Sequence, residues 1–202
     1  MAILLIGCAA TSVKSTWKAP DHKGPVSKVA VLAVEERGDV RQALENRFRN
    51  QLEEKAQPAI VTHQLLSLDE IKEDKQKAAA EVHKAGAEAV LIVRMVDSTT
   101  RAREVRATPA LFAPVTTGIG TAYAAPGWYD YYTVAFMDMG TVWGSVEQTI
   151  YLETCLFDLK NGKLIWSALT ETTLRENMDR LEEADRLVAK VLAAARQDGM
   201  IR

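Results

Sequence analysis

The strongest structural signal in this sequence of 202 residues is the stretch CLFDLKNGKLIWSA, which covers residues 155–168. Two strand-like runs meet at Asn161-Gly162, a pair that favours a two-residue type I′ turn because both of its residues need positive φ. A two-residue loop fixes the register of a hairpin, and side chains alternate across each strand. We therefore expect Phe157 to face Trp166 on the buried side of a β-hairpin.

Strands and helices alternate before this hairpin. The continuous apolar runs at residues 28–34 and 89–93 are typical of strands covered on both faces, and residues 59–62 form a shorter strand. One helix is predicted to start at Asp39 and a second at Asp69, each with the aspartate as its cap. The predicted order is β-α-β-α-β. The apolar stripe of the first helix consists of Val40, Leu44, Phe48 and Leu52.

A further helix follows the hairpin. The sequence Thr173-Leu174-Arg175-Glu176 fits a capping box, and an apolar stripe then continues until Gly199. Together these elements predict an α/β fold on the border with α+β, in which a single mixed sheet is followed by a carboxyl-terminal helix. We expect one domain over residues 28–202, which is close to the usual size of a single domain.

Charge and hydropathy exclude two classes of protein. The formal net charge is -2 and charged residues make up 26% of the chain, so the basic footprint that nucleic-acid binding requires is missing. After the first six residues, no run approaches the ~20 apolar residues of a membrane-spanning helix. We therefore expect no nucleic-acid partner and no spanning segment in the body of the chain.

The residues Leu5-Ile6-Gly7-Cys8 resemble the lipobox of exported bacterial lipoproteins, because an apolar run ends at a small residue and a cysteine. The resemblance implies that Cys8 is lipidated and that residues 1–7 are the remnant of a signal peptide. None of these seven residues is Lys or Arg, so we expect the true start codon to lie further upstream. The alternative interpretation of the run is a buried strand or a frayed terminus.

Residues 8–27 are expected to form a lipidated tether. The stretch is polar and is interrupted by Pro20, Gly24 and Pro25, which suits a loop better than a packed element. A flexible chain of this length has a root-mean-square reach of roughly 25 Å. Such a tether would let the domain float close to the membrane.

The second cysteine of the chain is expected to be buried. If Cys8 carries lipid, Cys155 has no partner for an intramolecular disulfide. The predicted hairpin register places Cys155 opposite Ala168 on the buried face. A lone thiol in an oxidising compartment fits such a protected position.

An insertion over residues 109–145 is rich in Gly, Pro and aromatic residues and carries almost no charge. Insertions of this length are usually functional or disordered. Its aromatic cluster is either an exposed patch that binds a partner, as Tyr and Trp do at interface centres, or a lid that folds back onto the sheet. The candidate partner-binding residues are Trp128, Tyr129, Tyr131 and Tyr132.

The sequence contains no recognisable catalytic or metal-binding constellation. His63 and His83 stand alone, without Cys, Asp or Glu at a metal-ligand spacing, and are expected to be surface or satisfied histidines. No serine lies in a nucleophile elbow, and the glycine pairs lack the remaining features of a phosphate or dinucleotide loop. We therefore expect no catalytic residues, no metal and no cofactor.

The order of elements, the hairpin over residues 158–166 and the lipobox together resemble a group of bacterial envelope lipoproteins. The predicted domain is similar to the amino-terminal domain of the translocation protein TolB, to the curli secretion lipoprotein and to lipoprotein activators of penicillin-binding proteins. These domains act by binding, which implies a protein without enzymatic activity. Residue 9 is Ala rather than Asp, which by similarity to sorted lipoproteins implies the outer membrane, with the domain facing the periplasm.

The function we expect is that of an accessory or scaffold module that binds an envelope protein partner. Two other classes of function stay open from the sequence. One is an envelope enzyme with a dispersed site, and the other is a subunit of an outer-membrane secretion assembly. The sequence does not indicate whether the chain forms a homo-oligomer.

Overall fold

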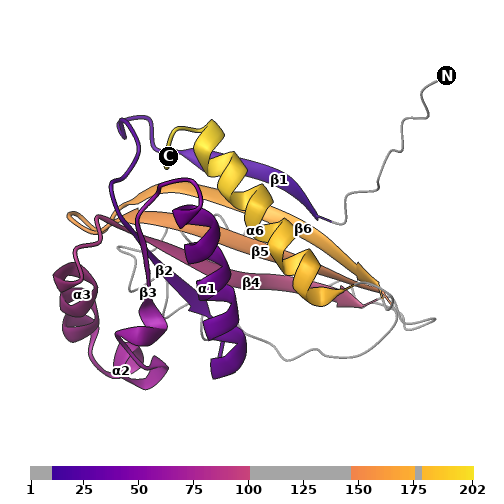
Figure 1. The fold of residues 1–202 in the computed structure, drawn as a ribbon, viewed down its shortest axis with the longest axis horizontal. Helices are drawn as coiled ribbons and strands as arrows, with labels where there is room; N and C mark the ends of the chain where they lie inside the picture. The colour runs from indigo at the N-terminus through magenta and orange to yellow at the C-terminus, as the bar shows by residue number, and fades with distance from the viewer. Residues whose placement is uncertain (1–10, 101–146, 176–178) are drawn as a thin grey trace, which may run out of the picture.

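The computed structural model of the chain describes residues 11–100, 147–175 and 179–202 (Figure 1). The insertion over residues 109–145, with its four candidate aromatic residues, lies outside this part, as does Cys8. Among the described helices, none combines the length and apolar character needed to cross a membrane.

A six-stranded mixed sheet with the strand order β1-β6-β5-β4-β2-β3 forms the centre of the fold. Strands β2, β3 and β4 are parallel, and the other neighbouring pairs are antiparallel. The predicted α/β class with a single mixed sheet is confirmed. In chain order the elements are β1 (Thr11–Lys18), β2 (Val29–Val34), α1 (Gly38–Glu53), β3 (Ala59–Val61), η1 (Thr62–Gln64), α2 (Leu68–Glu73), α3 (Lys75–Lys84), β4 (Ala89–Thr100), β5 (Glu147–Asp158), β6 (Leu164–Arg175) and α6 (Arg180–Gln197).

The sheet divides the core into two layers, because alternate side chains of each strand point to opposite faces. Helices α1 and α6 lie across the same face of the sheet (Figure 1). The cluster beneath them includes Val29, Val31, Phe48, Trp166 and Val188. The cluster on the other face, with α2 and α3, includes Ala30, Leu32, Ile71, Val82 and Phe157.

The expectation of a free tether is wrong for residues 11–18, which form strand β1 beside β6. The Thr11 hydroxyl hydrogen-bonds the Thr172 hydroxyl at 3.0 Å, and Thr11 is buried. The run was hard to recognise because a strand at the edge of a sheet needs few apolar residues and often carries lysine. The residues that were expected to interrupt regular structure, Pro20, Gly24 and Pro25, come after this strand.

The predicted hairpin exists, but its register is wrong. Its loop has four residues, 159–162, because the Asp158 amide donates to the Lys163 carbonyl oxygen at 2.9 Å. The side chains of Asp158 and Asn161 stabilise this longer loop by accepting hydrogen bonds from the Lys160 and Lys163 amides. Within the loop only Gly162 has positive φ, so a type I′ turn does not form.

A bulge then shifts the pairing between Leu156 and Phe157, so that Leu156 lies opposite Trp166 and Cys155 opposite Ser167. A shift by one residue moves side chains to the other face of a sheet. Trp166 and Ala168 therefore pack beneath α1 and α6, whereas Cys155 and Phe157 face α2 and α3. The predicted burial of Cys155 is confirmed, although its predicted neighbour is not.

The helix starts also differ from the prediction. Ser67 caps α2 and Asp74 caps α3, so the single helix expected from Asp69 is divided in two. Helix α1 begins at Gly38 without a side-chain cap, and Asp39 lies in its first turn. Helix α6 is capped by Asp179 rather than by the predicted box at residues 173–176, since β6 runs on to Arg175.

Candidate functional site

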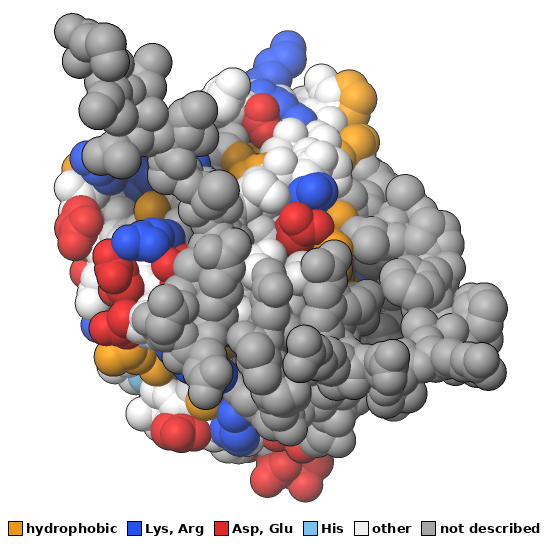
Figure 2. All heavy atoms as spheres, turned by 90° about the vertical axis from the view of Figure 1, so that its right-hand side faces the viewer, with side chains coloured by type: hydrophobic (Ala, Val, Ile, Leu, Met, Phe, Trp, Pro, Cys, Tyr) orange, Lys and Arg blue, Asp and Glu red, His pale blue; other side chains and the backbone are white. Residues whose placement is uncertain are grey.

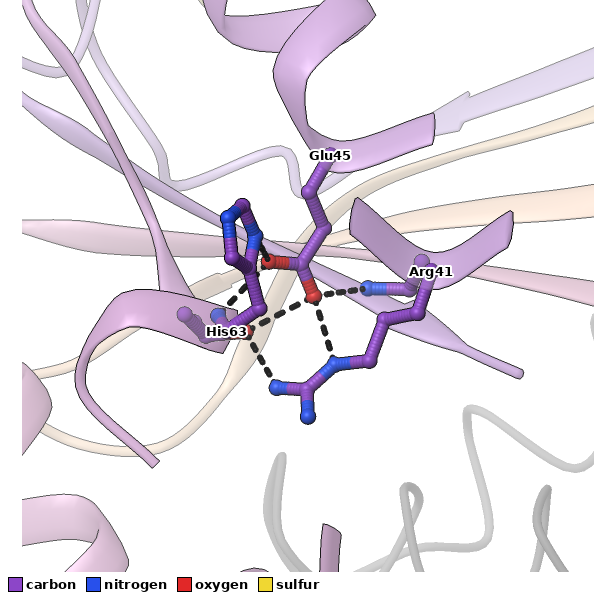
Figure 3. Close-up of polar contacts among 5 residues, drawn as sticks. Arg41, Glu45 and His63 are labelled. Atoms are coloured by element: carbon purple, nitrogen blue, oxygen red, sulfur yellow. Dashed lines mark hydrogen bonds and ion pairs between the residues drawn. The ribbon is translucent and has the colours of Figure 1, made fainter. Parts of the chain in front are cut away.

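The carboxylate of Glu45 is the centre of a buried polar cluster (Figure 3). Its Oε1 accepts hydrogen bonds from the Ala33 amide at 3.1 Å, from the Arg41 Nε at 2.9 Å and from the Thr62 hydroxyl at 3.0 Å. Its Oε2 accepts from the amide of His63 at 2.8 Å and from the ring Nδ1 of the same residue at 2.9 Å. Glu45 is fully buried, and we call this group the Glu45 cluster.

Three elements bring the Glu45 cluster together at the carboxyl ends of two parallel strands. Ala33 lies near the end of β2, Thr62 and His63 directly follow β3, and Arg41 and Glu45 are one turn apart on α1. The chain leaves β2 toward α1 on one face of the sheet and leaves β3 toward α2 on the other face. Such a switch point at the strand ends is where open α/β sheets commonly bind ligands.

The charges of the Glu45 cluster compensate each other within the protein. The side chains of Arg41 and Glu45 are 5% and 0% exposed, and the Arg41 Nη2 also donates to the Thr62 hydroxyl at 3.1 Å. A buried charge is tolerated only when it is paired and hydrogen-bonded. The cluster therefore holds α1 rigidly against the ends of β2 and β3.

The cluster fixes the orientation of the His63 ring. An ionised carboxylate only accepts hydrogen bonds, so the Nδ1 of His63 must carry the proton that points to Glu45. The Nε2 lies on the far side of the ring, and the side chain is 11% exposed. Carboxylates orient catalytic and metal-binding histidines in the same way. Within the described residues, however, no three His, Cys, Asp or Glu side chains gather as a metal site would require.

A second buried ion pair joins β4 to β5, next to the end of β2. The Nε of Arg94 on β4 contacts the Oε2 of Glu153 on β5 at 2.8 Å, and the two side chains are 2% and 0% exposed. Arg94 pairs with Val34 at the end of β2, directly after the Ala33 amide that binds Glu45. The end of β2 is thus flanked by two buried pairs of opposite charges.

The loop between β2 and α1 contains a more exposed ion pair, between Arg37 and Glu35. Partial burial raises the pKa of Glu35, but hydrogen bonds from the side chain and amide of Arg37 outweigh it and lower that pKa overall. The Arg37 amide and Nε each donate to the Glu35 Oε1 at 3.0 Å. The ion pair holds the loop in place where it enters α1.

Sequence reasoning identified His63 only as an isolated histidine, because its partner Glu45 lies 18 residues earlier in the chain. The signal that could have revealed the cluster is the spacing of the buried stripe of α1. That stripe contains Arg41, Glu45, Phe48 and Leu52, so charged residues occupy two of its positions. The other candidates, Cys8 and the four aromatic residues of the insertion, lie outside the described residues.

No protein-family model matches the chain, and no curated protein matches it either. Among solved structures, the chain is similar to a point variant of the PelC dodecamer from Paraburkholderia phytofirmans, with 16% identity and a TM-score of 0.51 over 91% of this chain and 96% of that chain. A second PelC dodecamer from that organism has 14% identity and a TM-score of 0.49 over 91% and 95% of the two chains. Lipoprotein GNA1162 from Neisseria meningitidis has 14% identity and a TM-score of 0.41 over 85% and 99%.

The similarity with a TM-score of 0.51 shows that the chain shares its mixed α/β fold with PelC over nearly the whole length of both chains. At such low identity, the similarity concerns the fold alone. The more specific resemblance to the TolB domain, the curli secretion lipoprotein and the penicillin-binding-protein activators has no support from a family model.

Proposed function

We propose that this chain is a lipid-anchored lipoprotein of the bacterial envelope, and that its domain is a binding or scaffold module for an envelope protein partner. The observation that carries the proposal is the sequence Leu5-Ile6-Gly7-Cys8, with its cysteine at the position that receives lipid. Ala9 in place of Asp favours the outer membrane, with the domain in the periplasm. The domain folds from residue 11 onward, close behind that cysteine.

A role in binding is favoured by the character of the Glu45 cluster. The Glu45 carboxylate accepts five hydrogen bonds, and Arg41 and Thr62 also bond to each other. Groups that are satisfied within the protein stabilise the fold and have little remaining capacity to bind a substrate. We therefore assign the cluster a structural role and assign no catalytic residues.

The partner-binding surface is proposed to include Trp128, Tyr129, Tyr131 and Tyr132. The segment that contains them lies in the sequence between Thr100, the last described residue of β4, and Glu147, the first residue of β5. Loops on a rigid scaffold carry binding residues more often than the scaffold does. Tyr and Trp are also enriched among the residues that dominate binding energy at interfaces.

Cell fractionation tests the lipid anchor. We expect the protein, expressed with a complete signal peptide ahead of Leu5, to enter the membrane fraction and to incorporate labelled palmitate. The variant Cys8→Ser should do neither, because it lacks the thiol that accepts the lipid. Equal membrane recovery of both forms would contradict the proposal.

Crosslinking in intact cells tests the binding role. We expect the anchored protein to be captured with a specific envelope protein, and the combined substitution of Trp128, Tyr129, Tyr131 and Tyr132 by Ser to abolish that capture. The matched control replaces Tyr123 with Ser, which removes one aromatic ring of the same segment outside the cluster. Undiminished capture by the fourfold variant would exclude this cluster as the binding surface.

A self-assembled scaffold is a second candidate, favoured by the fold shared with PelC, which forms a dodecamer. An assembly of this kind would give the periplasmic partner several copies of the same surface. Light scattering on the detergent-solubilised lipidated protein measures the mass directly. Self-assembly predicts a large multiple of 22.3 kDa, and a protein mass near that of one chain would exclude it.

A further inference from the structure

Strand β1 is locked into the sheet from its first residue. Thr11 pairs with Thr172 of β6, its hydroxyl bonds to that of Thr172, and its exposed fraction is 3%. Strand β1 therefore moves with the sheet from Thr11 onward. Any flexible link between the lipid and the domain is limited to the residues that precede Thr11.

This link is short if Cys8 carries the lipid, as proposed above. Three Cα–Cα steps separate Cys8 from Thr11, and at 3.8 Å each they span at most about 11 Å. The tether expected over residues 8–27 would have reached roughly 25 Å. The start of β1 must consequently stay beside the lipid headgroups.

The strand register defines which end of the domain is held there. Thr100 at the end of β4 pairs with Gln148 on β5, and Glu147 pairs with Arg175 at the end of β6. Thr11 lies at this same end, because it pairs near the end of β6. We call it the anchor end.

Helix α6 starts at the anchor end and runs back along the sheet. Its last turn is at the opposite end, where the Trp166 Nε1 donates to Asp198 at 2.7 Å and the Lys18 Nζ donates to the Asp198 carbonyl oxygen. Its first turn presents Leu181, which is 62% exposed and is the exposed large apolar side chain of the described part. An apolar side chain at this place is suited to the boundary between headgroups and acyl chains.

We propose that the anchor end lies against the bilayer, with the strands pointing away from it and the hairpin loop 159–162 remote from the lipid. This inference rests on the proposed lipidation of Cys8 and adds an orientation to it. Strand β6 has 12 residues, so the hairpin loop stands about 40 Å from the anchor end. The surface of the membrane is thus the partner of this end of the fold.

The charged side chains at the anchor end show whether charge attraction could hold this end at the membrane. Figure 2 shows this end, and acidic and basic side chains of the described residues are intermixed on it. A surface of mixed sign is not drawn to anionic lipids as a polybasic patch is. The proposed orientation therefore relies on the short link between Cys8 and Thr11 and not on the charges of the described residues.

Spin labels test this orientation in the full lipidated chain. A nitroxide is attached through Leu181→Cys at the anchor end or through Lys160→Cys in the hairpin loop, and Cys155 is buried and does not compete. The protein is reconstituted into vesicles of phosphatidylethanolamine and phosphatidylglycerol that contain a gadolinium-chelating lipid. The two labels are separated by about 40 Å. We therefore expect gadolinium to enhance the relaxation of the Leu181→Cys label at least about tenfold more than that of the Lys160→Cys label.

A linker insertion provides the control. Ten Gly and Ser residues between Ala10 and Thr11 should leave the chain on the vesicles but reduce the difference between the labels to less than about twofold, because the link becomes a flexible coil. Equal enhancement of both labels in the native chain would overturn the orientation and leave the lipid anchor intact. Failure of the chain to float with the vesicles would overturn the anchor and the orientation together.

Discussion

At the scale of single residues, the Glu45 cluster places two opposite charges in the core, where each would destabilise the fold without the other. Arg41 and Glu45 lie on the core-facing side of α1, where apolar residues would be expected. They are retained there by hydrogen bonds to Ala33, Thr62 and His63, which hold α1 against β2 and η1. If one charge of the Arg41–Glu45 pair is removed, the other charge stays buried without its counterion and destabilises the fold.

We expect Glu45→Gln to lower the free energy of unfolding by about 3–5 kcal/mol, because Arg41 then stays buried without its counterion. The double substitution Arg41→Met and Glu45→Leu removes both charges and should cost less than Glu45→Gln alone. Urea unfolding of the native chain and these variants, together with the single substitutions Arg41→Met and Glu45→Leu, measures the differences. A double variant that loses the sum of the two single losses would show that the charges do not act as a pair.

The side chain of Trp166 is the second residue whose contribution can be tested. It is fully buried beneath α1 and α6, and its Nε1 donates to Asp198 at the end of α6. We expect Trp166→Ala to cost about 3–5 kcal/mol, as for other buried aromatic residues. Trp166→Phe should keep most of the apolar contact and cost less. Thermal unfolding that ranks the two variants in the reverse order would place Trp166 outside the core.

At the scale of elements, hydrophobic pattern predicted the elements that are buried on both faces and failed where polar side chains direct the backbone. Strands β2 and β4 were recognisable as continuous apolar runs, and helix α1 was recognisable because apolar residues recur at every fourth position. Strand β1 escaped recognition because it lies at the edge of the sheet and is mostly polar. The hairpin register depended on hydrogen bonds of the Asp158 and Asn161 side chains, which a dipeptide rule does not include.

The candidate site was less predictable than the fold for the same reason. Glu45 and His63 approach each other only through the crossover from α1 to β3, and neither belongs to a local motif. Charged residues at positions 41 and 45 of an otherwise apolar stripe were the visible trace of the cluster. A partner for such charges follows from tertiary structure and not from spacing along the chain.

The amino-terminal cap of α2 gives an element-scale prediction for the dependence of stability on pH. Hydrogen bonds from the amide of Ser67, and then from Lys77, lower the pKa of Glu70 from 4.5 to about 2. Because this pKa is lowered in the folded state, ionised Glu70 stabilises the fold. This contribution to the free energy of unfolding is complete above pH 4.5 and disappears as the pH falls toward 2. We expect Glu70→Ala to lower the melting temperature at pH 7 and to have a smaller effect at pH 3.

The control for this experiment is Glu73→Ala, which removes a carboxylate from the same helix outside the capping box. It should show a smaller change between the two pH values. The capping interpretation would be contradicted by a Glu70→Ala effect that is the same at pH 7 and pH 3.

At the scale of the whole molecule, the sheet connects two features that the sequence presents separately. Cys8, the proposed lipidation site, lies three positions before Thr11, and the segment with the aromatic cluster lies between Thr100 and Glu147 in the sequence. The register brings Thr11, Thr100 and Glu147 to one end of the sheet. In a lipid-anchored scaffold, the two described residues that flank the proposed binding segment would thus lie at the end of the sheet that is closest to the lipid.

The amino-terminal residue of the mature protein tests the central proposal most directly. The protein is expressed in a diderm bacterium with a complete export signal ahead of Leu5, purified from membranes, and its amino-terminal peptide is analysed by mass spectrometry. A lipid anchor predicts a peptide that begins at Cys8, with a diacylglyceryl group on its sulfur and an acyl group on its amine. A peptide that begins upstream of Cys8 and contains a free thiol would contradict the account.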